Sequence, residues 1–262
     1  MIRLALLGAT GRMGLRVADL LNDDPRFHLV AALTRRDDPR LGQSLQYRNQ
    51  DLRFTESTDD PFDVLLDVAA PAATISWLEP CIQQSAAMVI GSTGHSPTQL
   101  AAIQAVANRI PVLKTGNFSL GVNLLLSLVA DIANRLGDDY DIEIIEHHHN
   151  QKVDAPSGTA VSFLDTIIRA TGRRPDADII YGRQGHTGPR PKRQIGVHAV
   201  RMGDIVGHHE ILFSAPGETI SLRHTAASRD TFARGALHAC AWLHGKPPGL
   251  LYSMTDTLDH PA

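Results

Sequence analysis

Short apolar runs alternate with amphipathic segments through the first half of the chain. The runs that have the length of buried strands are residues 2–7, 28–33, 63–69, 88–90 and 110–114. The segments between them predict helices that begin near residue 12, at residue 72 and at residue 97. Strands that are apolar along most of their length and alternate with helices are typical of a parallel sheet covered on both faces. This half therefore predicts an α/β fold.

The pattern changes after Gly116. Helices are expected over residues 121–136, 159–170 and 229–243, and a strand over 141–146. Residues 173–193 are basic and contain glycine and proline, so they predict a long loop. Three strand-like runs follow at 194–201, 204–214 and 218–224, joined by turn sequences at 202–203 and 215–217. The second half therefore predicts an α+β region with a mostly antiparallel or mixed sheet.

Composition narrows the class of protein. The chain has 262 residues, of which 43% are hydrophobic, and a net charge of -3, so a packed core is expected and a general nucleic-acid binder is not. Cys81 and Cys240 lie far apart and form no CxxC motif, which disfavours a zinc ribbon or a disulfide scaffold. No apolar run reaches the length of a membrane span, and the N-terminus has no signal-peptide pattern. We expect a cytoplasmic protein that binds neither membrane nor nucleic acid.

A glycine-rich loop follows the first predicted strand. It reads Gly8-Ala9-Thr10-Gly11-Arg12-Met13-Gly14 and opens an amphipathic helix. Glycines allow a tight turn and a close approach to a pyrophosphate, whose charge then lies at the helix N-terminus. The alternative is a tight turn with a structural role alone. We interpret the loop as part of a Rossmann-like dinucleotide-binding domain of residues 1–118, to which the C-terminal segment 229–262 is expected to return.

The end of the second strand bears on the cofactor. An NAD-binding domain normally places a carboxylate there, whereas this chain has Thr34, Arg35 and Arg36. Guanidinium groups suit a 2′-phosphate, so NADPH is the preferred cofactor. Two alternatives stay open: a solvated basic turn, and a ribose contact from Asp37 or Asp38. NADH is therefore also possible.

Two further loops follow strands in the same domain. Gly91-Ser92-Thr93-Gly94 and Thr115-Gly116-Asn117-Phe118 are small and rich in hydrogen-bonding groups. Ligands of open α/β sheets bind at the carboxyl ends of strands, so these loops are expected beside a nicotinamide ribose. Either of them can instead be an ordinary connection.

The densest chemistry lies in residues 146–160. While the strand lasts, His148 points to the face opposite His147 and His149. A histidine supplies a proton near neutral pH, and Lys152 adds a positive charge for a carboxylate. Ser157 caps a helix whose first N–H groups, at Gly158 and Thr159, are suited to an anion. We interpret this segment as a proton-donor site for a small acidic substrate.

Residues 147–149 allow two other interpretations. Neighbouring histidines diverge, and neither an HExxH motif nor a nearby cysteine is present, so a metal site is not expected. A cluster of exposed structural histidines is the other alternative. Asp154 either orients Lys152 or caps the turn.

Residues 146–160, EHHHNQKVDAPSGTA, closely resemble the signature of the dihydrodipicolinate reductase family. The resemblance extends over the whole chain, through GATGRMG, GSTG, GNFSLGVN, GRQGHTG and MGDIVGHHEI. The long signature is highly specific, whereas the glycine loop alone is not. His147 departs from the family pattern, where a small residue is usual, and Thr34 departs from members with an acidic residue there.

The resemblance implies roles for individual residues. His148 matches the proton donor and Lys152 a second donor, while His149, Gly158 and Thr159 match substrate contacts. The residues that match cofactor contacts are Gly8, Ala9, Thr10, Gly11, Arg12, Met13, Thr34, Arg35, Gly91, Ser92, Thr93, Thr115, Gly116, Asn117 and Phe118.

The resemblance also implies an activity. A member of this family reduces 4-hydroxy-tetrahydrodipicolinate to tetrahydrodipicolinate with NAD(P)H, in the diaminopimelate route of lysine biosynthesis. It further implies that residues 119–228 form a substrate-binding and oligomerisation domain of a homotetramer. The alternatives are a reductase of a related small imine or acid, a nicotinamide sensor without turnover, and a metal-dependent hydrolase that uses the histidines.

Overall fold

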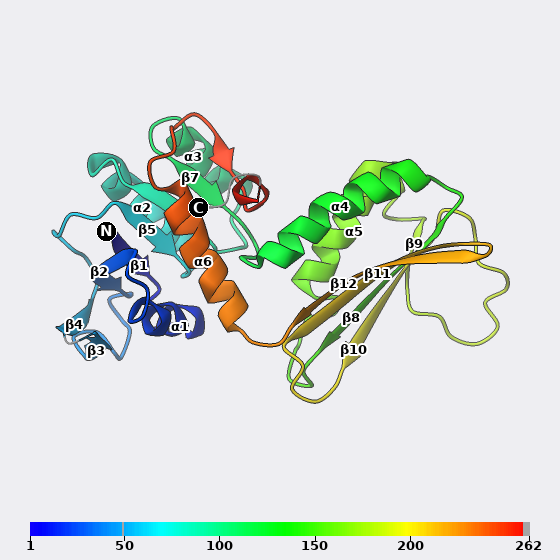
Figure 1. Ribbon diagram of the computed structural model, residues 1–262, viewed down its shortest axis with the longest axis horizontal. Helices are drawn as coiled ribbons and strands as arrows, with labels where there is room; N and C mark the ends of the chain where they lie inside the picture. The colour runs from blue at the N-terminus through cyan, green and yellow to red at the C-terminus, as the bar shows by residue number, and fades with distance from the viewer. Residues whose placement is uncertain (49, 259–262) are drawn as a thin grey trace. The chain divides into compact units, whose positions relative to one another are not determined.

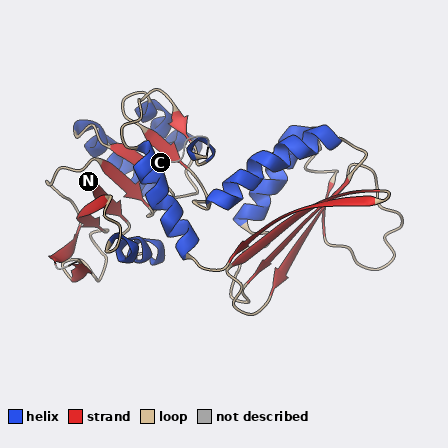
Figure 2. Ribbon diagram, viewed as in Figure 1, coloured by secondary structure: helices blue, strands red, loops and turns tan. Residues whose placement is uncertain are grey.

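The computed structural model describes residues 1–48 and 50–258, which form two compact units (Figure 1). The first unit contains Met1–Leu120 together with the described residues from Asp230 on, and the second contains Gly121–Arg229. Helices and strands are interleaved in the first unit, whereas the second has a sheet with two helices on one face (Figure 2). None of the helices in the described ranges is long and apolar enough to cross a membrane.

The first unit is built on an eight-stranded sheet in the order β13-β7-β6-β5-β1-β2-β4-β3. Every neighbouring pair is parallel except the β3–β4 hairpin. The strands are β1 (Ile2–Leu7), β2 (Phe27–Leu33), β3 (Ser44–Tyr47), β4 (Gln50–Thr55), β5 (Val64–Asp67), β6 (Ala87–Ile90), β7 (Val112–Lys114) and β13 (Leu251–Tyr252). Strands β5 and β6 are buried along their whole length, as expected for strands covered on both faces.

Two hydrophobic clusters cover the two faces of this sheet. Leu4 and Leu6 of β1 pack with helices α1 (Arg12–Leu21) and α6 (Asp230–Leu243). Ala5 and Leu7 pack with α2 (Pro71–Gln83) and α3 (Pro97–Ala107) on the opposite face. The alternation along one strand thus separates two helical layers, which is the doubly wound arrangement that the sequence predicts.

Helix α6 returns to the first unit from the far end of the chain. Arg16 of α1 makes two hydrogen bonds to the carboxylate of Asp230, each 2.6 Å long. A Cβ atom on Gly235 would lie only 1.9 Å from the carbonyl oxygen of Phe118, so the helix backbone lies directly against the chain that leaves β7. A short 3-10 helix, η1 (Thr255–Thr257), follows β13.

The second unit has a five-stranded sheet in the order β12-β11-β8-β10-β9. Its strands are β8 (Asp141–His148), β9 (Ile179–Tyr181), β10 (Ile195–Arg201), β11 (Gly207–Ala215) and β12 (Glu218–Ala226). Helices α4 (Leu120–Leu136) and α5 (Gly158–Thr171) pack on one face, where Ile142 and Ile144 of β8 lie in the core. Strand β8 is central, parallel to β10 and antiparallel to β11.

The predicted fold class is confirmed, and several elements need correction. Strands β10 and β11 do not form a hairpin across residues 202–203, because β8 lies between them in the sheet. The segment that connects β10 to β11 passes the end of β8. Three backbone bonds tie that connection to the residues that end β8, among them His149 N–H to the carbonyl of Ile205. The turn at 215–217 does join the β11–β12 hairpin. Strand β9 lies inside the segment predicted to be a loop, and β3, β4 and β13 were not predicted, since all four are short and paired at or near sheet edges.

Candidate functional site

The glycine loop of the first unit is shaped by two close approaches. Gly8 has a φ of +86°, and a Cβ atom there would lie 2.9 Å from the backbone of Ala69. At Gly14, a Cβ atom would lie 2.2 Å from the carbonyl oxygen of Gly8. Helix α1 begins after Gly11 with no side-chain cap, so the N–H groups of its first turn are not satisfied by a capping side chain. This is the arrangement that binds a phosphate at a helix N-terminus.

Two adjoining cavities of the first unit share Ala69 and Ala70, which follow β5, and we call them the glycine-loop groove. One has a volume of about 740 Å³ and the other of about 540 Å³. The predicted residues that line the first are Gly8, Thr10, Thr34 and Arg35. Those that line the second are Met13, Gly91, Ser92, Thr93, Gly116, Asn117 and Phe118.

Four of the predicted cofactor residues do not line these cavities. They are Ala9, Gly11, Arg12 and Thr115. Ala9 is fully buried beneath the loop, and the Thr115 hydroxyl donates to the carbonyl of Asn117, 2.8 Å away. Arg12 is exposed at the start of α1. These four residues therefore support the loops or lie outside the groove.

The end of β2 carries a hydroxyl pair and a carboxylate. The Thr10 and Thr34 hydroxyls are 2.9 Å apart, and Thr10 donates to Asp38 over 2.7 Å. The backbone N–H of Arg40 also donates to Asp38, and these two bonds hold the pKa of Asp38 below its usual value. Arg35 is exposed and forms an ion pair with Asp37. Both cationic and anionic groups therefore stand at this end of the groove.

Asp67 at the end of β5 is a polar group that the sequence reasoning missed. Its fully buried carboxylate accepts hydrogen bonds from Thr74, Ser92 and the N–H of Ala69. Burial raises the pKa of Asp67. Because the Ser92 hydroxyl is used in this bond, it serves to hold the loop after β6. The sequence signal for Asp67 is an acidic residue that directly follows the apolar residues 64–66 at the carboxyl end of the strand.

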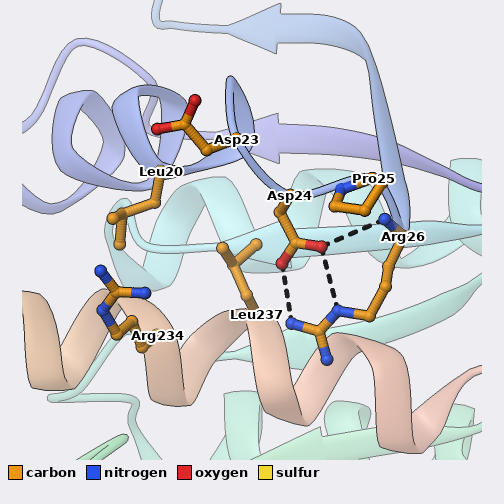
Figure 3. Close-up of a pocket in the computed structure, with 7 residues that line it drawn as sticks. All are labelled: Leu20, Asp23, Asp24, Pro25, Arg26, Arg234 and Leu237. Atoms are coloured by element: carbon orange, nitrogen blue, oxygen red, sulfur yellow. Dashed lines mark hydrogen bonds and ion pairs between the residues drawn. The ribbon is translucent and has the colours of Figure 1, made fainter.

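A third hollow, of about 390 Å³, lies between α1 and α6 (Figure 3). Its lining includes Asp24 and Arg26, which are hydrogen-bonded to each other just before β2 begins. It lies at the amino end of β2, whereas ligands of such sheets bind at the carboxyl ends. None of the predicted cofactor residues lines it.

In the second unit, β8 divides the predicted histidines between its two faces. The strand runs two residues further than predicted, to His148. His147 faces His208 on the side opposite α4 and α5, with ring centroids 4.8 Å apart. His148 is buried and lies against His209, with ring centroids 5.1 Å apart. His149 follows the end of the strand and is partly exposed.

A fully buried carboxylate, Glu146, stands beside His148. Its Oε2 atom is 2.5 Å from Nδ1 of His148, and Arg201 donates to both of its oxygens over 2.8 and 2.7 Å. The backbone N–H of Ser157 donates to Oε1 over 3.0 Å. Burial alone raises the pKa of Glu146, but these bonds outweigh it and leave the pKa below its usual value. Glu146 is thus an ionised acceptor of four hydrogen bonds.

The pKa of His148 reflects opposing influences. Burial lowers it, and the charges of Lys152 and Arg201 lower it further, whereas Glu146 raises it through its hydrogen bond and its charge. The net direction is below the ordinary histidine value. Lys152 itself is held by Asp154, whose oxygens are 2.8 and 2.9 Å from its Nζ atom. The alternative in which Asp154 orients Lys152 is the one that the structure supports.

The start of α5 completes this group. The Ser157 hydroxyl accepts from the N–H of Ala160, and its oxygen lies 3.1 Å from Nε2 of His209, within hydrogen-bond distance. Burial lowers the pKa of His209 to about 3, so this ring is neutral. Gly158 and Thr159 form the first turn, with Gly158 exposed. A buried histidine, a lysine ammonium and a capped helix start thus stand together. Within the described ranges, no group of three or more His, Cys, Asp or Glu side chains is placed to hold a metal ion.

Two models of one protein family together match nearly the whole chain. Residues 2–118 match the model described as dihydrodipicolinate reductase, N-terminus, and residues 121–258 match its C-terminus counterpart. The chain belongs to the dihydrodipicolinate reductase family. The family resemblance predicted from the signature at 146–160 is therefore confirmed.

Curated relatives agree along the whole chain. A protein of Thiobacillus denitrificans is 44% identical over 263 residues, which cover 98% of each chain. A protein of Hahella chejuensis is 42% identical over 265 residues, covering 98% of this chain and 99% of the relative. Both relatives are named 4-hydroxy-tetrahydrodipicolinate reductase.

Solved structures give the same assignment of fold. A dipicolinate-bound dihydrodipicolinate reductase of Paenisporosarcina superposes with a TM-score of 0.78 at 26% identity, covering 98% of this chain and 99% of that chain. An aspartate dehydrogenase of Thermotoga maritima, at 12% identity and a TM-score of 0.51, covers 95% of this chain and shares the fold alone.

Proposed function

We propose that this chain catalyses the NAD(P)H-dependent reduction of 4-hydroxy-tetrahydrodipicolinate to tetrahydrodipicolinate, in the diaminopimelate route of lysine biosynthesis. The observation that carries the proposal is that the chain belongs to the dihydrodipicolinate reductase family. Relatives that match it along its whole length are named for this reaction. The chemistry of residues 148–159 agrees with it, since a proton donor, a cation and an anion-binding helix start suit a cyclic dicarboxylate.

The second unit supplies the groups that handle this substrate. The Lys152 ammonium, His149 and the N–H groups of Gly158 and Thr159 bind its carboxylates, because a cation and a helix N-terminus both stabilise anions. The 4-hydroxyl group of the substrate leaves as water, and His148 donates the proton that, together with the hydride, completes the reduction of the conjugated double-bond system that remains. Its Nδ1 atom is engaged by Glu146, so Nε2 is the atom that gives the proton. The positive charge of Lys152 assists this transfer by favouring loss of the proton from His148.

The first unit has the features that a dinucleotide requires. The uncapped start of α1 and the close packing at Gly8 and Gly14 leave room for a pyrophosphate, and the glycine-loop groove is large enough for the attached nucleosides. Bound NAD(P)H supplies the hydride for the reaction. The residues that would hold it are the predicted ones that line the groove, with Ala9 and Thr115 supporting the loops.

NADPH is the preferred cofactor in this proposal. Strand β2 ends at Leu33, and Thr34 follows it in place of a carboxylate. Arg35 and Arg36 line the same cavity and are exposed enough to reach a 2′-phosphate. Asp38 is already engaged by Thr10 and by the N–H of Arg40, which leaves it less free to bind a ribose hydroxyl. NADH is accepted with lower affinity.

The assembly and location are also proposals. The second sheet favours a homotetramer for two reasons. Strand β12 lies at the sheet edge, where a strand of another chain can pair with it. The helices α4 and α5 cover one face of the sheet, which leaves the other face for contact with a second copy. Static light scattering that returns the mass of one chain would remove this proposal. A cytoplasmic location agrees with Cys81 and Cys240, which are both free thiols.

The test of the activity is oxidation of NADPH by the purified full-length protein. The substrate is formed in the cuvette from pyruvate and aspartate semialdehyde by the synthase that precedes this step, and NADH is run in parallel. We expect substrate-dependent oxidation, faster with NADPH at low cofactor concentration, and competition by dipicolinate. NADPH that binds without being oxidised would point instead to a sensor or to a reductase of another imine.

A further inference from the structure

Glu146 differs from an ordinary buried ion pair in the number of functional groups that it joins. Its side chain is fully buried, and its two oxygens accept from His148, Arg201 and the Ser157 N–H. Burying a carboxylate is unfavourable unless every lone pair has a partner. The partners come from the same strand, from β10 and from the residue that precedes α5.

The bond to His148 decides which nitrogen of the ring carries a hydrogen. A carboxylate can only accept, so Nδ1 of His148 must be protonated at a distance of 2.5 Å. In the neutral ring, Nε2 is then the unprotonated atom, and in the charged ring it holds the transferable proton. A Cβ atom on Gly207 would lie 3.2 Å from Nε2, so the absence of a side chain at Gly207 leaves space beside this atom.

The bond to Ser157 fixes the start of α5. The N–H of Ser157 donates to Oε1 of Glu146 and its hydroxyl caps the helix through the N–H of Ala160. The next two residues, Gly158 and Thr159, are the proposed carboxylate contacts. One carboxylate therefore sets the position of the proton donor relative to the groups that hold the substrate.

A second Glu–Arg–His group on β8 offers a comparison. Glu143, on the opposite face, accepts from Arg183, from Arg190 and from Nε2 of His198. Its side chain is partly exposed, and its hydrogen-bond partners include neither His148 nor Lys152 nor a residue at the start of α5. The chemical types are the same, but only the Glu146 group includes proposed site residues.

We propose, on the basis of the function proposed above, that Glu146 is a positioning residue of the reductase site. Its carboxylate, paired with Arg201, fixes the His148 ring so that Nε2 gives the proton and holds α5 so that Gly158 and Thr159 meet the substrate carboxylate. Glu146 acts through these residues and does not itself contact the substrate.

The test compares Glu146→Gln with Glu143→Gln in the full-length protein, by kcat, by KM for each substrate and by the pH profile of kcat. We expect Glu146→Gln to lower kcat by about 10²-fold, the scale of a positioned acid, and to raise KM for the dicarboxylate but not for NADPH. Glu143→Gln is expected to retain kcat. Glu146→Asp should recover part of the rate, since it keeps the charge.

The pH profile separates positioning from a purely structural role. The charged and titratable groups around His148 are Glu146 on β8, Arg201 on β10, His209 on β11 and Lys152 in the loop after β8. Glu146 is the one of these that raises the pKa of His148 by both bond and charge. Glu146→Gln should therefore lower the pKa of His148, so that kcat begins to decrease at a lower pH than in the wild type. A structural role alone lowers the rate without moving the profile, and that outcome contradicts the proposal.

A variant that fails to fold does not remove the test. Glu146→Gln leaves the Arg201 guanidinium unpaired, so the double variant Glu146→Gln with Arg201→Met removes both charges and is expected to fold with the same loss of kcat. In addition, nitrogen NMR of histidine-labelled wild-type protein, with His148→Gln for assignment, reports the tautomer. Neutral His148 protonated at Nδ1 supports the proposal, and protonation at Nε2 overturns it.

Failure of this inference is distinct from failure of the proposed function. If wild-type protein does not oxidise NADPH with the substrate, the proposed reaction is wrong, and the NMR tautomer still tests the Glu146–His148 arrangement. If the wild type is active and Glu146→Gln matches Glu143→Gln in kcat and pH profile, the reaction stands and the positioning role is wrong.

Discussion

The candidate sites of the two units are formed by different kinds of groups. The glycine-loop groove of the first unit is made by backbone, small residues and a helix start, and its shape depends on Gly8 and Gly14. The proton-donor group of the second unit is made by charged side chains around the buried carboxylate of Glu146. In the proposed function, the first type of site recognises a ligand by shape and backbone dipoles, and the second moves a proton.

This difference predicts that the two functions can be disrupted separately. Substitutions at the proposed site of the second unit should lower kcat and leave the affinity for the dinucleotide unchanged. Substitutions at the end of β2 should change the affinity for the cofactor and leave kcat unchanged. Variants in each unit test that separation.

Lys152→Ala is expected to lower kcat by about 10²-fold or more, the usual contribution of a positioned acid or cation in proton transfer. The variant removes the ammonium that Asp154 holds, and with it the cationic partner that the proposed function gives to the substrate carboxylate. Steady-state kinetics and NADPH titration by fluorescence measure the two functions. Lys192→Ala, at an exposed lysine of the same unit, is the matched control. Equal losses of turnover and of NADPH affinity would show that the segment has a structural role.

Arg35→Ala is expected to weaken NADPH binding by about 10-fold, the loss of one charge-assisted contact to phosphate. NADH binding should change little, because it lacks the 2′-phosphate. Titration with both cofactors measures the change. The control is Arg109→Ala, an exposed arginine of the first unit outside the groove. Parallel weakening of both cofactors would contradict the preference proposed for this end of β2.

Gly207→Ala adds a methyl group 3.2 Å from Nε2 of His148. This is tighter than ordinary contact, so either the ring or the strand must shift. We expect kcat to fall by roughly 10-fold, since a misplaced donor loses part of the 10²–10⁴-fold contribution of a general acid. Thermal unfolding should show a folded protein. A kcat equal to that of the wild type would mean that Nε2 does not use the space beside Gly207.

Glu143→Gln is expected to change the stability of the protein at low pH and to leave kcat unchanged. Although burial raises its pKa, its bonds to Arg183, His198 and Arg190 lower the pKa to about 2. A depressed folded-state pKa stabilises the protein above the unfolded value, and this contribution is lost as pH falls toward about 2. Glu143→Gln should therefore flatten the decrease in urea midpoint below pH 4.5. An unchanged slope would show that the Glu143 group does not stabilise the fold.

The sequence predicts the first unit better than the second. The glycine loop, the buried strands and the loops at 91–94 and 115–118 depend on residues that are neighbours along the chain. The association of these loops into one groove follows from the parallel order of β1, β5, β6 and β7. The short hairpin β3–β4 was missed, because its pattern of apolar residues is weak and it pairs at the sheet edge.

The environment of His148 was beyond sequence reasoning for a physical reason. Arg201 and His209 come from strands that pair with β8 only after the chain has passed residues 149–194. The expected hairpin across 202–203 would have placed β10 next to β11, away from Glu146. The signal that was available is the alternation along β8, which puts Glu146 on the same face as His148.

Turnover and NADPH binding measured on one preparation of His148→Gln test the separation of the two functions most directly. Glutamine retains a hydrogen-bonding side chain but has no transferable proton. We predict a fall in kcat of about 10² or more, with the dissociation constant for NADPH unchanged, and wild-type behaviour for His147→Gln on the opposite face of β8. Loss of NADPH binding together with turnover would contradict the account.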